Sequence, residues 1–214
     1  SYKRQQARWA RGTLQTVRKL AGPLLRSKLP LRQKLAGWMH MSGYFIHPLI
    51  LLMSLTTPLL LLQTLLTPGW APAWINMVSA LSAAPLISMA VASLARGRGL
   101  LAFARDLPSA LLLGIGVSFS NSMAMARALV TRDSGEFVRT PKVSPTSAQP
   151  RYRLRPDWTM WIELALALYT ICAIIVLGQM SSWFAVSPIA LYAFGYGGVW
   201  LGQMRSLSEH VDGG

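Results

Sequence analysis

Acidic side chains are scarce in this sequence, and cysteine is almost absent. Seven Asp and Glu residues stand against 21 Lys and Arg residues in a chain of 214. The single cysteine, Cys172, excludes a disulfide framework. Charge of either sign is missing between Lys34 and Arg96 and again between Glu163 and Arg205, and only 13% of all residues are charged. A soluble domain carries about a quarter, so these absences exclude an ordinary soluble protein.

Each uncharged tract is long enough for two membrane spans. A transmembrane helix needs about 20 mostly apolar residues, because roughly 30 Å of hydrocarbon is crossed at about 1.5 Å per residue. The four expected spans are 42–66, 75–94, 158–178 and 184–204. We therefore expect an all-α membrane protein with two transmembrane hairpins, 42–94 and 158–205.

The segments around these hairpins are basic or polar. Residues 1–41 read as amphipathic cytoplasmic or interfacial helices, interrupted at Gly22-Pro23. Residues 95–130 read as an interfacial helix, or one packed against the spans, because a small polar stripe runs along it. The stripe consists of Gly114, Ser118, Asn121 and Ser122. Residues 131–157 form an irregular basic loop, and 206–214 a tail.

Positive charge predicts the topology. Four spans place every Lys and Arg on one side, whereas a fifth would expose the basic loop outside. We therefore expect a multi-pass protein of the inner (plasma) membrane with both termini in the cytoplasm. The net charge of +14 then indicates contact with anionic membrane lipids, and we expect no nucleic-acid partner.

The stretch QQARW, residues 5–9, precedes the first span. On a helix, Gln5, Arg8 and Trp9 share one face, at positions i, i+3 and i+4. A guanidinium suits phosphate, and an indole ring suits the C–H face of a sugar or a cation. The alternative is an interfacial helix with an extended arginine and an aromatic anchor.

QQARW resembles the Q-x-x-R-W motif of membrane-embedded family-2 glycosyltransferases, such as cellulose, β-mannan and glucomannan synthases. A second stretch, FVRTPK at residues 137–142, resembles the F-x-V-T-x-K gating-loop motif of the same enzymes. Phe137, Thr140 and Lys142 match, while Arg139 replaces the valine. That departure is similar to the mannan-synthase-like branch, which tends to read F-x-R-T-P-K. Without the resemblance, FVRTPK would be a basic loop exposed to solvent or lipid.

The resemblance implies roles for the matching residues. Trp9 would form a sugar platform, and Phe137 would help to seat the gating loop beside the acceptor. The nucleotide diphosphate would be contacted by Gln5, Arg8, Thr140 and Lys142. The implied partners are a nucleotide sugar, such as UDP-glucose or GDP-mannose, and a glycan or lipid acceptor.

No carboxylate cluster in this chain matches the family's metal-binding and general-base motifs. Those motifs precede Q-x-x-R-W, so we expect the catalytic base, and the Mg or Mn ion of the complete enzyme, to lie upstream. Asp133 and Glu136 read as a solvated loop pair. Glu163 reads either as an interfacial residue or as a polar contact for a glycan or an Arg. His40 and His47 lack a third ligand nearby, so we predict no metal site or cofactor in the chain itself.

The predicted function is that of the C-terminal part of an inverting glycosyltransferase. The complete enzyme would transfer a hexose from a nucleotide sugar to a β-glycan acceptor, and this part would form the acceptor site and translocation channel. Two alternatives stay open: a non-processive enzyme with a lipid acceptor, and a stand-alone four-helix membrane scaffold.

Overall fold

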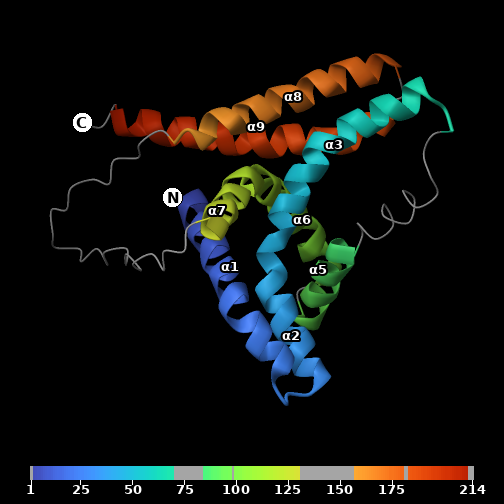
Figure 1. Cartoon of the computed structure of the whole chain (residues 1–214). Coiled ribbons are helices and arrows are strands. Elements are labelled where there is room, and N and C mark those ends of the chain that lie inside the picture. The colour runs from blue at the N-terminus through green and yellow to red at the C-terminus, as the bar shows by residue number, and fades with distance from the viewer. Residues whose placement is uncertain (1, 70–83, 98, 131–156, 181–182, 212–214) are drawn as a thin grey trace.

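In a computed structural model of the chain (Figure 1), the described residues are 2–69, 84–97, 99–130, 157–180 and 183–211, and all regular structure among them is helical. The expectation of an all-α protein is therefore confirmed for the described part of the chain. The elements are α1 (Tyr2–Arg26), α2 (Leu31–Ser42), η1 (Gly43–Phe45), α3 (Ile46–Leu66), α5 (Ala84–Ala95), α6 (Gly99–Gly116), α7 (Ser118–Val130), α8 (Thr159–Met180) and α9 (Trp183–Val211).

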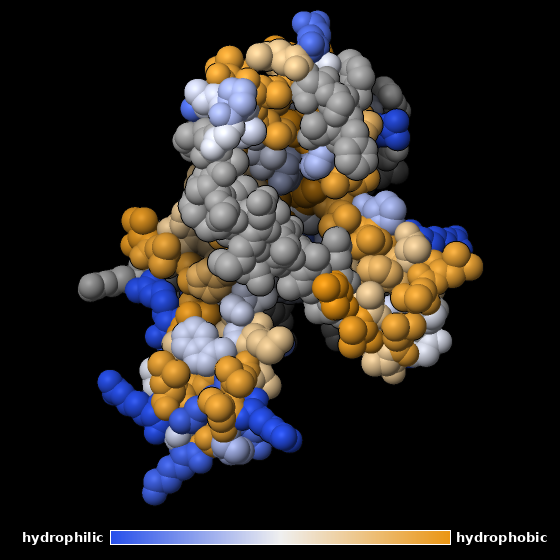
Figure 2. Space-filling view, turned by 90° about the vertical axis from the view of Figure 1, so that its right-hand side faces the viewer, coloured by the Kyte–Doolittle hydropathy of each residue, from blue (hydrophilic) through white to orange (hydrophobic). Residues whose placement is uncertain are grey.

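Within the described ranges, three helical segments are long and apolar enough to cross a membrane: Leu31–Leu66, Gly99–Gly116 and Thr159–Met180. Large apolar side chains on α3 and α8 point away from the protein interior, among them Leu52 and Leu59, which are 56% and 59% exposed. Helices that are apolar on all sides fit a hydrocarbon surrounding. Figure 2 shows apolar residues over much of one face, with hydrophilic side chains gathered at the lower end, where Figure 1 draws the α1–α2 junction.

The expected count of four spans remains a prediction. Part of the second expected span falls in residues 70–83, outside the described residues, and only α5 represents it. The fourth lies within α9. The segment 95–130, expected as one helix, is divided at Val117 into α6 and α7.

The expected interruption at Gly22-Pro23 is wrong, because α1 continues through it to Arg26. Proline lacks the N–H that would bond the carbonyl four residues earlier, and its ring crowds that carbonyl. Here Pro23 stands in the last turn of α1, where only the end of the hydrogen-bond ladder is affected. The amphipathic pattern therefore extends over one unbroken helix.

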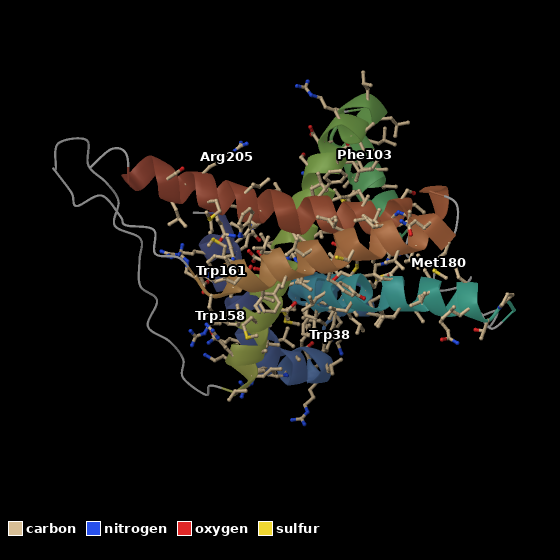
Figure 3. All side chains as sticks on the ribbon, turned by 90° about the horizontal axis from the view of Figure 1, so that it is seen from above. Trp38, Phe103, Trp158, Trp161, Met180 and Arg205 are labelled. Atoms are coloured by element: carbon tan, nitrogen blue, oxygen red, sulfur yellow. The ribbon has the colours of Figure 1, made fainter. Side chains whose placement is uncertain are left out.

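The helices form two groups that cross. Helices α8 and α9 pack along each other, and the outer half of α3 runs beside them (Figure 1). Helix α1 and helix α6 cross this group rather than following it (Figures 1 and 3). Figure 3 shows Trp158, Trp161 and Arg205 at one end of the α8–α9 pair and Met180 at the other. Tryptophan favours the membrane–water interface, so α1 lies across the end of the pair that has interfacial character.

The crossing of α6 and α9 depends on two glycines. A Cβ atom at Gly116 would lie 2.3 Å from Val199 Cγ2 and 2.4 Å from the Gly195 carbonyl oxygen. A Cβ atom at Gly195 would lie 2.6 Å from Ile115 Cγ2. These positions admit no side chain, so the two backbones approach closely, as small residues allow between helices in membranes.

We predict that Gly116→Ala and Gly195→Ala each destabilise the protein by about 1–3 kcal/mol, the usual cost of overpacking. Gly114→Ala and Gly197→Ala are matched controls, because a Cβ atom at either position meets nothing within 4 Å. These controls should be neutral or slightly stabilising, since alanine favours helix over glycine. Thermal unfolding of the four purified variants in detergent measures the difference, and equal behaviour of all four would contradict the close crossing.

Candidate functional site

The face of α1 that carries the motif residues is exposed. Gln5, Arg8 and Trp9 all belong to this continuous helix, so their spacing places them side by side on one face. All three side chains are exposed, and Trp9 retains 52% of its surface. The face therefore presents an amide, a guanidinium and a flat ring to the surroundings. Their expected roles toward a nucleotide and a sugar stay predictions.

The opposite face of α1 is packed against α7. Ala10 and Leu14 are buried in a small apolar cluster with Met125 and Ala128 of α7. The cluster gains a hydrogen bond at its edge, where Arg18 Nη1 donates to the carbonyl oxygen of Ala128 at 2.9 Å. The apolar half of the amphipathic helix is thus used for packing within the protein, which leaves the motif face free to meet a ligand or a partner.

A further contact fixes α1 against η1. The hydroxyl of Tyr44 donates to Gln6 Oε1 at 2.8 Å, and the Tyr44 ring packs against the apolar cluster of α1 and α7. Gln6 is, with Ala7, one of the two residues of QQARW to which the sequence assigns no role. Its position one residue after Gln5 turns it from the exposed face toward the protein, where it serves the fold.

Glu163 is fully buried on α8, and its counter-ion comes from α1. The ammonium nitrogen of Lys3 lies 2.7 Å from Glu163 Oε1 and 2.8 Å from Oε2, and it donates a hydrogen bond to Oε2. Lys3 also donates to Thr159 Oγ1 at 2.8 Å and to Gln203 Oε1 at 3.1 Å. An ammonium group has three donors, so this one is saturated by partners on α8 and α9.

The partners of Lys3 are themselves connected. Gln203 Nε2 donates to Glu163 Oε2 at 2.8 Å, and the Thr159 hydroxyl donates to Asp157 Oδ2 at 3.0 Å. The result is a polar network joining α1, α8 and α9 at the end of the bundle marked by Trp158 in Figure 3. A buried charge persists only when it is paired and hydrogen-bonded, and this network meets both conditions.

The network shows which groups the carboxylate of Glu163 contacts. An arginine or a glycan was among the expected contacts, and the structure pairs the carboxylate with Lys3 instead. A carboxylate in an apolar tract signals that a cation must lie near it. Nothing in the sequence, however, distinguishes Lys3 from the other Lys and Arg residues. Because Glu163 is buried and paired, it is no base for a substrate on the exposed face of α1.

A second buried polar cluster ties α9 to α3 and α7. The Tyr196 hydroxyl lies 3.0 Å from Ser54 Oγ and 2.9 Å from Ser118 Oγ, and all three side chains are fully buried. Asn121, one turn after Ser118, is also fully buried, and within the described part neither its oxygen nor its nitrogen has a hydrogen-bond partner. Ser118 and Asn121 of the expected polar stripe therefore face the bundle interior.

The gating-loop residues Phe137, Thr140 and Lys142 lie outside the described residues, as do Asp133 and Glu136. Across the described ranges, no three His, Cys, Asp or Glu side chains come together as a metal-binding group. The expectation that the Mg or Mn ion of the complete enzyme is held outside this chain stays a prediction. Within the described residues, the candidate site consists of the exposed face of α1 and the network that anchors its other side.

We predict that breaking the Lys3–Glu163 pair destabilises the protein strongly. Lys3→Met leaves a buried carboxylate without its counter-ion, a loss that costs roughly 3–5 kcal/mol in comparable buried pairs. Lys3→Met combined with Glu163→Leu should recover most of this stability, because no unpaired charge remains. Lys19→Met, an exposed position on the same helix, should change stability by less than about 0.5 kcal/mol. Thermal or denaturant unfolding of the purified variants tests this, and the account fails if Lys3→Met matches Lys19→Met.

Comparison of the chain with protein-family models, with curated proteins and with solved structures finds no match.

Proposed function

We propose that this chain is the membrane part of an inverting family-2 glycosyltransferase that extends a β-glycan. The observation that carries the proposal is the Q-x-x-R-W motif on an exposed face of α1, whose opposite face is packed and ion-paired to the bundle. A helix held on one side gives its other side a fixed position. Reactive groups gain rate from being held in a defined geometry, so anchoring of α1 supports a role in positioning substrate.

The second support is the resemblance of FVRTPK to the gating loop, with the roles proposed for Thr140 and Lys142 on the nucleotide diphosphate and for Phe137 beside the acceptor. In the proposed reaction, an acceptor hydroxyl oxygen forms a bond to the anomeric carbon of the donor hexose. The bond from that carbon to the diphosphate breaks, and the acceptor proton passes to a carboxylate base outside this chain. When a loop that carries hydrogen-bond donors closes over the site, those donors neutralise the leaving diphosphate, and the loop excludes water.

Arg8 and Trp9 have separable proposed roles. The guanidinium of Arg8 would form charge-assisted hydrogen bonds with the diphosphate, which its planar fork fits better than an ammonium does. The ring of Trp9 would stack on the acceptor sugar. Gln5 would add an amide contact to the diphosphate. These contacts to a diphosphate suit UDP-glucose or GDP-mannose as the sugar donor. The membrane lipids would surround the apolar helices.

We predict that Arg8→Ala in the complete enzyme weakens nucleotide binding by about ten- to a hundredfold, since a hydrogen bond to a charged group contributes about 1.5–3 kcal/mol. Arg8→Lys should restore part of the affinity. Arg26→Ala, at an exposed position near the end of α1, is the control and should leave it unchanged. Calorimetric titration with the nucleoside diphosphate measures the affinity, and unchanged binding by Arg8→Ala would remove the diphosphate role.

We predict that Trp9→Ala abolishes or severely reduces elongation while nucleotide affinity stays near that of the wild type. Trp161→Ala is the matched control, because Trp161 is similarly exposed, at 57% against 52%, but lies on α8. Initial rates of radiolabelled sugar incorporation, measured beside nucleotide affinity, separate the two roles. Wild-type elongation by Trp9→Ala would favour the scaffold alternative, in which QQARW is only an interfacial anchor.

A further inference from the structure

Two polar side chains in the interior of the bundle carry atoms without a hydrogen-bond partner. Asn121 on α7 is fully buried, and in the described part of the chain neither its amide oxygen nor its amide nitrogen is paired. His47 on α3 is 9% exposed, and its ring nitrogen Nδ1 is unpaired in the same part. Buried polar atoms are nearly always hydrogen-bonded, either to protein or to ordered water. These three atoms therefore point to a ligand.

Asn121 lies between two places where α7 meets the segment that contains α3. Ser118, three residues before it, belongs to the buried polar cluster with Ser54 of α3. Met125, four residues after it, belongs to the apolar cluster against which Tyr44 packs, just before α3. The helical period places these three α7 residues on one face. Asn121 is therefore opposite the stretch between Tyr44 and Ser54.

His47 lies in that stretch. Its ring is 5.5 Å from the Tyr44 ring, measured between centroids, and it forms a hydrogen bond with the backbone of Gly114, near the end of α6. His47 also stands about two helical turns before Ser54, which places both side chains on the same side of α3. The unpaired atoms of His47 and Asn121 are thus directed to one region of the interior, where α3 packs on α7.

Water is the ligand that these groups fit. A side-chain amide offers two donors and an acceptor, and a neutral imidazole offers one donor and one acceptor. An internal water molecule typically forms about three hydrogen bonds with polar groups that have no other partner. An apolar ligand would leave all three atoms unpaired. A metal ion would need a group of His, Cys, Asp or Glu ligands, and the described residues contain no such group.

We propose that the region between α3 and α7 binds at least one internal water molecule, which bridges Asn121 to His47 and extends the hydrogen bonds of the Ser54–Tyr196–Ser118 cluster. The water joins the two helices at a place where their polar side chains do not bond each other directly. This site is separate from the proposed glycosyl transfer, because no residue of the motif face takes part in it.

The variant Asn121→Leu distinguishes a hydrated site from a dry one by the sign of its effect, since the two side chains are similar in size. In a hydrated site, leucine removes the main partner of the water and leaves His47 Nδ1 unpaired. The melting temperature of the full chain in detergent should therefore fall by roughly 2–12 °C. In a dry site, leucine would relieve the cost of an unpaired amide. A higher melting temperature would thus overturn the proposal.

Thr170→Val is the matched control. Thr170 is also fully buried, but its hydroxyl bonds the carbonyl oxygens of Leu166 and Ala167 in its own helix, both at 2.9 Å. This change removes a buried polar group that needs no water, so it should lower the melting temperature much less than Asn121→Leu. Equal losses in the two variants would show a general effect of removing a buried polar group and would overturn the water site.

X-ray hydroxyl-radical footprinting with mass spectrometry tests for the water directly, because radicals formed from a bound water oxidise the side chains beside it. Tyr196 and Met125 are 0% and 4% exposed, so bulk solvent does not reach them. Short exposures should oxidise both in the wild type, severalfold less in Asn121→Leu, and to the wild-type extent in Thr170→Val. Absence of oxidation in the wild type would overturn the proposal even if Asn121→Leu fails to fold. Unchanged oxidation in Asn121→Leu would refute the role of Asn121.

Discussion

A carboxylate shielded from water needs a positive charge beside it, and in this protein that charge comes from a helix far away in the sequence. Glu163 on α8 is fully buried, and its counter-ion, Lys3, stands 160 residues earlier on α1. Desolvating either charge alone costs several kcal/mol. The pair therefore gives α1 one place to dock, and the α1–α7 packing and the position of the motif face follow from that place.

The two faces of α1 then serve different purposes. The inner face supplies the ammonium of Lys3 and the apolar contacts of Ala10 and Leu14. The outer face presents Gln5, Arg8 and Trp9. In the proposed enzyme, the outer face handles donor and acceptor. The inner face holds the helix against α7, α8 and α9.

Much of this arrangement could be predicted from the sequence because it follows from local pattern. Uncharged tracts predict apolar helices, and the 3.6-residue period predicts which residues of α1 share a face. The continuity of α1 through Pro23 was missed, because the cost of a proline depends on its distance from the helix end. The division at Val117 was missed because apolar, helix-forming residues continue on both sides of it.

The long-range contacts could not be predicted, for a different reason. The chain has 17 glycines, and only the meeting of α6 with α9 distinguishes Gly116 and Gly195 from the others. Lys3 is likewise one of 21 basic residues until the fold brings it to Glu163. Similarly, no local feature of the sequence around Ser54, Ser118 or Tyr196 indicates that they share hydrogen bonds across three helices. Such pairs are selected by tertiary geometry, on which a single sequence carries no direct information.

The central claim is that the buried ion pair fastens α1 to the rest of the bundle. Hydrogen–deuterium exchange of the purified chain, read peptide by peptide in wild type and in Glu163→Gln, tests it most directly, because exchange reports local opening of each helix. The account predicts faster exchange in the first turns of α1 in the variant, with α3 and the second half of α8 unchanged. Unaltered protection of α1, or a uniform loss across all helices, would contradict it.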